Sequence, residues 1–352
     1  MNSTNKAANA RKKTEIVMNE AKDSRSTYLA FDIGGTKIAY GLVTLPESAE
    51  SNFGKESEDC VSPTVQDYGS MSTEAAKGGE DIKNRLVARA KQILEDAAKS
   101  GKKINGIGIA AAGVPNSKTG EIVAATDILP GWRGQRIYDA FKSVTDLPVY
   151  MIGDVGGHGL GEAIYGAGRG KSIVFSVGIG TGIGGAIIID GKLFTGAHGV
   201  AGHAGHVVSD LGVGFDCSCG AHAGHIEPVA SGTGLATLYN SNLPQGAELA
   251  QNGYEVCVRA NSGQDAHAKE TLARSGKALG QCVAGMANLI DPDVIVLSGS
   301  VVEAGDIWWN AMRSGFEDSA LTLIKNTPIL KGQLGGSAPL IGAAWAVHSN
   351  RV

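Results

Sequence analysis

Two short glycine-rich turns are the segments of this sequence best suited to bind phosphate. The first is Asp32-Ile-Gly-Gly-Thr-Lys37, and the second is Gly178-Ile-Gly-Thr-Gly-Ile-Gly184. Glycine has no Cβ, so backbone N–H groups in such turns can approach an anion closely. The phosphate contacts are therefore expected from Gly34, Gly35, Thr36, Lys37, Gly178, Gly180, Thr181 and Gly182, while Asp32 would hold a metal-bound water.

Either turn alone would also suit an ordinary tight hairpin with glycine at its positive-φ positions. The first turn lacks the Gly-x-x-x-x-Gly-Lys spacing of a Walker A loop. The two turns are about 145 residues apart, and each joins two apolar, β-rich runs. Two related turns on one duplicated scaffold could clamp a triphosphate from two sides, and this favours the phosphate interpretation.

Asp154 is the candidate catalytic group. It follows the apolar run 149–152, and functional side chains of open α/β sheets lie at such strand ends. A carboxylate there could accept the proton of a substrate hydroxyl that attacks a γ-phosphate. The alternative is that Asp154 caps the helix that follows it.

A segment rich in His and Cys, residues 198–227, is a candidate zinc site. It contains five of the eight histidines, among them His203, His206, His222 and His225, together with Cys217-Ser-Cys219. Two Cys and two His are a frequent ligand set for structural Zn²⁺, which could hold together a loop with little apolar content. Solvated histidines and reduced thiols are the alternative, and the spacing leaves open which histidine completes the set.

The elements that must position these residues follow a repeated pattern. Each half opens with a buried strand, a glycine turn and a returning strand: residues 28–33 and 37–43 in the first half, 172–177 and 185–189 in the second. Helices are expected at 80–99, 270–290 and 340–348, and further strands at 104–110, 149–152 and 294–297. The segment 47–58 is expected to be a loop. The pattern predicts an internally duplicated α/β protein.

Length and composition set further limits. The 352 residues suggest two lobes, and a net charge of −4 argues against nucleic acid as a partner. No apolar run is long enough to span a bilayer, and residues 1–26 are polar and lack the core of a signal peptide. Residues 1–26 are therefore predicted to be a disordered tail. The odd number of cysteines, five, together with the missing signals, predicts a reducing, cytoplasmic location.

Together the segments resemble the ROK family of sugar kinases and repressors, from about residue 28 to residue 348. The resemblance is carried by Gly202-His-Ala-Gly-His206, Cys217-Ser-Cys-Gly220, Gly224-His-Ile-Glu227 and Asn288 to Gly299, besides the two glycine turns. It implies a duplicated actin/hexokinase-type ATPase fold with two lobes and a cleft between them. The expected lobes are 27–150, joined by the C-terminal helix 340–352, and 151–339, with the inserted segment 198–227.

The resemblance also implies roles for matching residues. Asp154 would be the general base, His206 and Glu227 would bind the sugar, and Gly299 would lie on the adenosine side. Zinc would be held by His206, Cys217, Cys219 and His225, so that His206 uses one ring nitrogen for the metal and the other for the sugar. ATP and Mg²⁺ are the implied donor and cofactor, and a homodimer is usual in the family. The loops at Gly113 and Asp127 are expected to line the sugar site.

Four positions depart from the family pattern. His203 stands where most glucokinase-like members have Glu, and the resulting Gly-His-x-Gly-His resembles bacterial N-acetylmannosamine kinases. Gly153 replaces the Asn that usually precedes the catalytic Asp. His225 replaces the third Cys of the zinc motif, one residue later than usual, so His222 competes with it. Asp127 replaces an Asn.

The resulting hypothesis is phosphorylation of a hexose 6-hydroxyl, with N-acetyl-D-mannosamine as the preferred acceptor because of His203. Alternatives are a glucokinase or glucomannokinase, an N-acetylglucosamine kinase, and polyphosphate as donor. A ROK-type repressor is disfavoured because only about 27 residues precede the first phosphate strand. A sugar-binding protein without catalysis is disfavoured because Asp154 and both turns are present.

Overall fold

The structure is a computed structural model that describes residues 25–46, 62–243 and 246–350. The predicted loop 47–58, Cys60 and nearly all of the predicted tail lie outside the described residues. The first strand, β1, spans Arg25–Ile33 and therefore begins earlier than the expected Tyr28. Its first residues are polar, but they pair with the end of β2 (Lys37–Pro46), so that Arg25 lies opposite Pro46. Pairing with a long partner thus extends the strand beyond its apolar run.

Within the described residues, two five-stranded sheets share one topology. The first has the order β3-β2-β1-β4-β7, and the second the order β10-β9-β8-β11-β12. In both, the opening strand pairs antiparallel with the strand that follows it and parallel with a later strand. The other strands are β3 (Thr64–Ser72), β4 (Ile107–Ala111), β7 (Val149–Gly153), β8 (Ile173–Ile179), β9 (Ile183–Ile189), β10 (Lys192–Phe194), β11 (Val294–Ser298) and β12 (Ile329–Lys331), and β5 (Val114–Asn116) pairs with β6 (Glu121–Ala124).

Side-chain alternation along β1 divides the core of the first half. Leu29, Phe31 and Ile33 face the helix α1 (Gly79–Lys99), whereas Tyr28 and Ala30 face the C-terminal helix α9 (Ala338–Ser349). Successive strand residues point to opposite faces, so a buried run without alternation is covered on both sides. The first sheet therefore lies between two helical layers.

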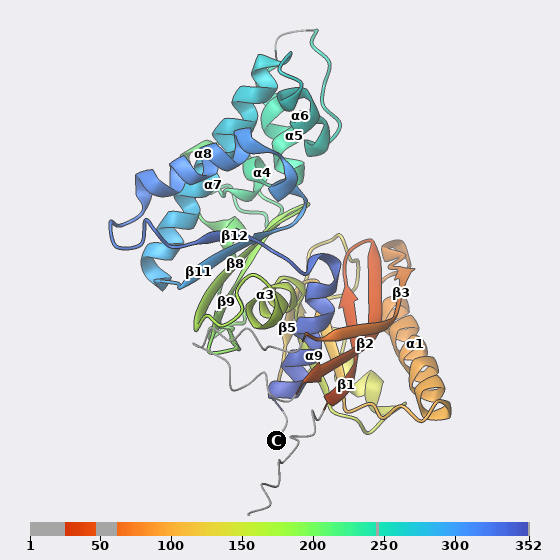
Figure 1. The fold of residues 1–352 in the computed structure, drawn as a ribbon. Helices are drawn as coiled ribbons and strands as arrows, with labels where there is room; N and C mark the ends of the chain where they lie inside the picture. Colours follow the sequence, from red (N-terminus) through yellow and green to blue (C-terminus); the bar gives the residue numbers. More distant parts are fainter. Residues whose placement is uncertain (1–24, 47–61, 244–245, 351–352) are drawn as a thin grey trace, which may run out of the picture.

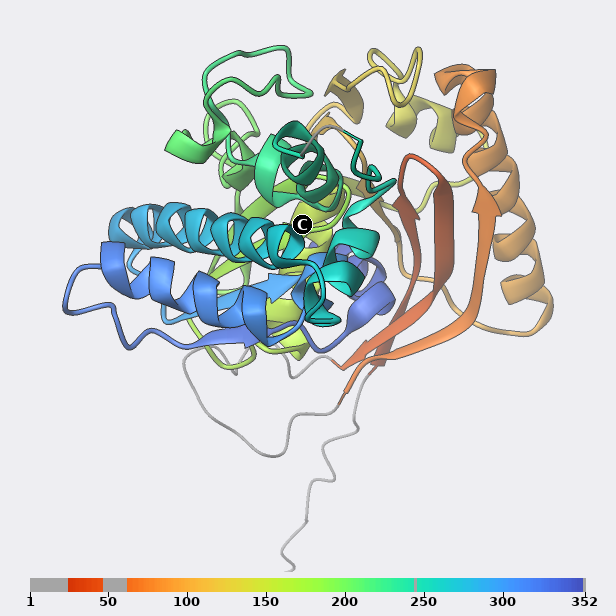
Figure 2. The same ribbon diagram turned by 90° about the horizontal axis from the view of Figure 1, so that it is seen from above.

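The second sheet is covered in the same way. Its outer face packs on α7 (Ala266–Ile290) and α8 (Asp306–Ser319), which lie side by side (Figure 2). Its inner face packs on α3 (Asp154–Tyr165). The remaining helices are α2 (Ile137–Lys142), α4 (Glu227–Ala230), α5 (Gly232–Ser241) and α6 (Gly253–Asn261).

The helices α3 and α9 form the layer between the two sheets (Figure 1). They pack closely on each other: a Cβ on Gly161 would lie 2.2 Å from the carbonyl oxygen of Ala338. Although α9 comes last in the chain, it contacts β1, β2, β4 and β7 of the first sheet. One buried cluster thus contains residues of both sheets and both helices.

Among the described residues, no helix has the length and apolar character needed to cross a bilayer. The repeated strand–turn–strand units and the three expected helices are present, the last of them beginning at Ala338 instead of Leu340. The sequence reasoning missed the edge strands β3, β10 and β12, the short strands β5 and β6, and the helices α2 and α8. The strand β3 is exposed along much of its length, so its sequence lacks the apolar pattern by which a buried strand is recognised.

Candidate active site

The first glycine turn joins β1 to β2 and is held from an edge strand. The N–H of Gly34 donates to the carbonyl of Lys37 at 3.0 Å and closes the turn. Thr73, fully buried just after β3, donates its hydroxyl to the carbonyl of Gly34 at 2.7 Å, and its N–H to that of Thr36 at 2.9 Å. Thr36 and Lys37 are exposed at the tip. The turn is therefore rigid at its base and open at the residues that could contact an anion.

The second glycine turn joins β8 to β9 and is held from a helix start. Gly180 donates its N–H to the carbonyl of Gly182 at 2.9 Å. The N–H of Gly232, the first residue of α5, donates to the carbonyl of Gly180 at 2.7 Å. The hydroxyl of Thr233 donates to the carbonyl of Thr181, also at 2.7 Å. These bonds use the carbonyls of the turn and leave the N–H of Thr181 at its exposed tip.

Gly299 lies against the same turn, directly after β11. Its φ is +98°, and a Cβ there would lie 2.4 Å from the carbonyl oxygen of Ile179. A side chain at this position would therefore be strained and would collide with the end of β8. The structure brings Gly299 and the second turn together.

Asp154 is the first residue of α3, directly after β7. Gly153 occupies the N-cap position, and Asp154 Oδ1 accepts a hydrogen bond from the N–H of Val155 at 2.9 Å. The side chain of Val155 lies against the second turn, since a Cβ on Gly184 would be 2.6 Å from it. Asp154 therefore stands one residue inside the helix rather than at the cap, at the same end of the fold as both turns.

Burial perturbs the pKa values of the two carboxyl groups of this region, and the charge of Asp154 adds to the effect at Asp32. The pKa of Asp32 is raised to about 7, first by burial and then by the negative charge of Asp154, while Lys37 acts in the opposite direction. Burial also raises the pKa of Asp154, against the effects of the Val155 N–H and of His203. A carboxylate whose pKa is raised is a stronger base, and nearby cations would be attracted to the pair.

The residues expected on the acceptor side lie in two places. Gly113, with φ of +93°, borders Gly153: a Cβ on Gly153 would lie 3.7 Å from the carbonyl oxygen of Gly113. Asp127 is exposed, and its neighbour Ile128 lies against the first turn, 2.8 Å from where a Cβ on Gly35 would be. The structure thus groups Gly113 and Gly153 with Asp154, whereas the Asp127 loop borders the phosphate turn.

Four residues of the His/Cys segment converge on one point. The candidate ligand atoms of His206, Cys217, Cys219 and His225 all lie within 4.8 Å of one another. Cys217 Sγ is 3.6 Å from His206 Nδ1, and Cys219 Sγ is 3.5 Å from His225 Nδ1. His222 is not part of this group, because its Nδ1 lies 2.7 Å from Asp216 Oδ1 on the surface. This cluster could hold a metal ion.

The donor set and the two sulfur–nitrogen distances fit a tetrahedral ion. Metal–sulfur bonds of about 2.3 Å and metal–nitrogen bonds of about 2.0–2.1 Å place sulfur and nitrogen ligands about 3.5–3.6 Å apart. Burial lowers the pKa of His206, which favours the neutral imidazole that binds metals. Burial also raises the pKa of the Cys217 thiol, so a cation would have to stabilise its thiolate.

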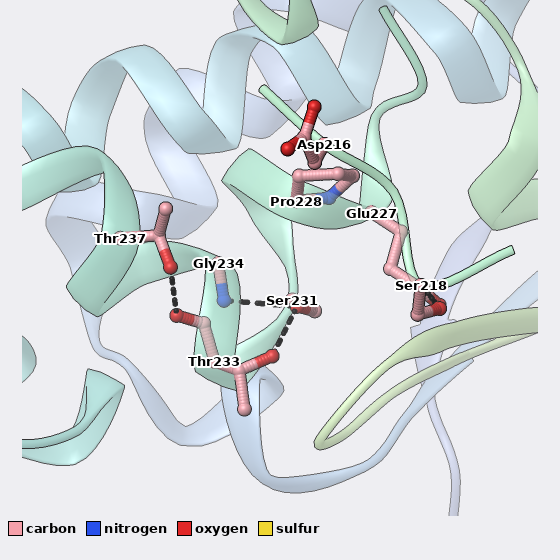
Figure 3. A pocket seen from close by; sticks show the side chains of 8 residues that line it. All are labelled: Asp216, Ser218, Glu227, Pro228, Ser231, Thr233, Gly234 and Thr237. Carbon is pink, nitrogen blue, oxygen red and sulfur yellow. Dashed lines mark hydrogen bonds between the residues drawn. The ribbon is translucent and has the colours of Figure 1, made fainter. Parts of the chain in front are cut away.

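Glu227, the first residue of α4, lies between the metal cluster and the second turn. Its Oε2 accepts a hydrogen bond from the N–H of Ile183 at 2.9 Å, and its Oε1 accepts one from the hydroxyl of Ser218 at 2.7 Å. A polar pocket of about 290 Å³ adjoins it (Figure 3). The pocket is lined by Asp216, Ser218, Glu227, Pro228, Ser231, Thr233, Gly234 and Thr237.

Three residues that support the site escaped the sequence reasoning: Thr73, Thr233 and Ser218. Ser231-Gly-Thr-Gly234 carries a helix-start signal, and Ser231 does cap α5 by accepting from the Gly234 N–H at 3.0 Å (Figure 3). That signal locates a helix but not the turn it supports, which is 52 residues away in the chain.

Two glycine turns on a doubled sheet, with a half-buried carboxylate beside both, are typical of phosphotransferases of the duplicated actin/hexokinase-type ATPase fold. Comparison with known proteins confirms this class. The sequence profile described as "ROK family" matches residues 28–350, and the chain therefore belongs to this family.

Several relatives are similar over most of their length. A glucokinase of Halalkalibacterium halodurans is 29% identical over 330 residues, covering 91% of this chain and 94% of the relative. An N-acetylmannosamine kinase of Yersinia pestis is 32% identical over 326 residues, covering 90% and 97%. The crystal structure of a ROK family glucokinase from Streptomyces griseus, in complex with glucose and AMPPNP, superposes with a TM-score of 0.69 at 27% identity, covering 91% and 98%. The chain is a sugar kinase, as the sequence predicted.

Proposed function

We propose that this chain transfers the γ-phosphoryl group of ATP to the 6-hydroxyl of a hexose, with N-acetyl-D-mannosamine as the preferred acceptor. The observation that carries the proposal is the position of Asp154. It is half-buried beside Asp32 of the first turn, next to the helix start that packs on the second turn, and its pKa is raised.

In this proposal Asp154 accepts the proton of the acceptor hydroxyl as that oxygen attacks the γ-phosphorus. The two turns hold the donor phosphates, and Lys37 contributes positive charge. Asp32 would hold Mg²⁺ through bound water, and Mg²⁺ would supply charge stabilisation for the transferred group. A carboxyl group with a raised pKa, close to a cation site, fits this role because the cation favours its ionised form.

We further propose that the ion of the Cys/His cluster is structural Zn²⁺, held by His206, Cys217, Cys219 and His225. The Cys₂His₂ donor set and its spacing support this assignment. With Nδ1 of His206 directed toward Cys217, the other ring nitrogen is left to bind the sugar, beside Glu227. The proposal also includes a homodimer in the cytoplasm.

His203 supports N-acetylmannosamine over glucose. Its side chain is exposed, its ring lies 5.9 Å from that of His206, and it is close enough to Asp154 to influence the pKa of that carboxyl group. His203 therefore stands on the acceptor side. An imidazole, which can donate or accept a hydrogen bond, would suit the amide of N-acetylmannosamine better than the Glu carboxylate that most glucokinase-like members have at this position. Glucose is the second candidate, because the glucokinase relative covers this chain to the same extent.

The test is a comparison of kcat/KM on N-acetylmannosamine, N-acetylglucosamine and glucose, with ATP and with polyphosphate as donors. N-acetylmannosamine with ATP should give the highest value, and H203E should shift the preference toward glucose. The matched control is H222E, because His222 is an exposed histidine of the same segment that is not among the four residues of the cluster. A tenfold or larger preference of the wild type for glucose would refute the acceptor assignment.

A further inference from the structure

Glu227 joins two segments that the chain keeps far apart. Oε2 accepts a hydrogen bond from the N–H of Ile183, which lies in the second glycine turn at the start of β9. Oε1 is bound to the hydroxyl of Ser218, which lies between Cys217 and Cys219 of the metal cluster. One carboxylate therefore connects the metal-binding loop to the turn proposed to hold phosphate.

The turn is shaped around this carboxylate. A Cβ on Gly182 would lie 2.7 Å from Glu227 Oε2, so a glycine allows the carboxylate to reach the N–H of Ile183. An ionised carboxylate offers about four acceptor sites, and these two bonds use two of them. The remaining sites can accept hydrogen bonds from the hydroxyls of a ligand without disturbing the anchor.

Ser218 is the closer of the two side-chain donors near Oε1. Its hydroxyl lies 2.7 Å from Oε1, whereas Cys217 Sγ, a candidate metal ligand, lies 3.9 Å away. The Ser218 hydroxyl is therefore the main side-chain partner of Oε1 among the described contacts of Glu227.

We propose that Ser218 is a positioning residue whose hydroxyl fixes the Glu227 carboxylate, so that the metal loop, the acceptor-binding carboxylate and the second glycine turn act as one unit. This deepens the proposed function and rests on it. The consequence is energetic coupling: an acceptor that binds Glu227 also restrains the turn, and bound nucleotide restrains Glu227. Each ligand should then strengthen the binding of the other.

The experiment measures this coupling by calorimetry in the metal-loaded protein, without turnover. The affinity of a non-hydrolysable ATP analogue is determined with and without N-acetylmannosamine or glucose, for the wild type, S218A and S218T. The wild type should bind the analogue several-fold more tightly when sugar is present. S218A should lose most of this difference and raise both KM values about threefold to tenfold, and S218T, which keeps the hydroxyl, should restore it.

The control is S209A, on the same segment but with its side chain beside Cys282. Metal content, measured by atomic emission, should be unchanged in every variant. Unaltered coupling in S218A would overturn the positioning role, and so would loss of metal from S218A, because the hydroxyl would then serve the metal loop alone. If the wild type binds neither sugar nor nucleotide, the proposed function itself fails, and this result differs from both.

Discussion

The two glycine turns have the same place in their sheets, but they differ in charge and in support. The first contains Asp32 and Lys37 and is held by Thr73, whose own carbonyl accepts from Arg85. The second contains no charged residue and is held by backbone and hydroxyl donors at the start of α5. Its return strand is bound in addition by the carboxylate of Glu227.

This difference indicates a division of labour within the duplicated fold. The first turn contains its own charged residues, and the hydrogen bonds that hold it come from Thr73 at the end of the edge strand β3. The second turn depends on segments that follow it in the chain, and through Glu227 it is connected to the metal cluster. The two turns are therefore alike in position, whereas the residues that support them differ between the halves.

The largest effect is expected at Asp154, which lies beside both turns. D154N removes the proposed base while keeping the shape of the side chain. It should lower kcat by about 10²-fold or more, in line with positioned base catalysis, while sugar affinity is retained. Steady-state kinetics and calorimetric sugar binding test this together. Near-normal turnover would exclude Asp154 as the base.

The first turn should make the stability of the protein depend on pH through Asp32, whereas the second turn contains no titratable residue. Its pKa is near 3.8 in the unfolded chain and about 7 in the fold, so the folded state binds the extra proton between these values. The free energy of unfolding of the protein without ligands should therefore fall as pH rises from about 4 through about 7. Because the side chain is only partly buried, we expect a loss of about 1–3 kcal/mol rather than the full value of about 4 kcal/mol.

D32N should remove most of this dependence. Urea unfolding at pH 5 and pH 8, without Mg²⁺ or nucleotide, should show the variant gaining on the wild type at the higher pH. If the difference in the free energy of unfolding between D32N and the wild type is the same at both pH values, the raised pKa of Asp32 in the first turn is contradicted.

The candidate metal cluster lies in the half that carries the second turn. C217S should lower zinc content and the melting temperature together, by several degrees, because metal binding contributes directly to the stability of the loop. C257S, on α6 and outside the cluster, is the matched control and should keep its metal. Full activity of C217S without bound metal would show that the segment is an ordinary loop.

The smallest effects should come from the two threonines that hold the turns. T233V and T73V each remove a hydroxyl donor to a turn carbonyl, a loss of about 0.5–1.5 kcal/mol, and should raise the KM for ATP about threefold to tenfold. T237V is the control on α5, since Thr237 donates within its own helix. If only one of the two variants affects the KM for ATP, the turns do not share the donor phosphates as proposed.

Much of this fold could be predicted because its signals are local. The turn glycines, the buried strands and Asp154 after β7 are each recognisable within a few residues, and the duplication repeats them. The family resemblance added the fold, the kinase class and the candidate metal ligands. The sequence left two histidines as the fourth ligand, and the structure places His225 with the cluster and His222 with Asp216.

The residues that support the site could not be predicted, because their contacts join segments that are far apart in the chain. Thr73 and Gly34 are 39 residues apart, and Thr233 and Thr181 are 52 apart. Each threonine alone is an ordinary polar residue near the end of an element. Its function exists only in the contact, and a single sequence contains no signal for that contact.

The position of α9 has a consequence for the order in which the protein can be completed on the ribosome. Tyr28, at the beginning of the described chain, shares a hydrogen bond of 2.9 Å with His348, near its end. The inner face of the first sheet, built from early residues, therefore stays without its cover until almost the whole chain has emerged. A ribosome-bound chain would expose that apolar face throughout the synthesis of the second half, and this is the stage at which it would most need a chaperone.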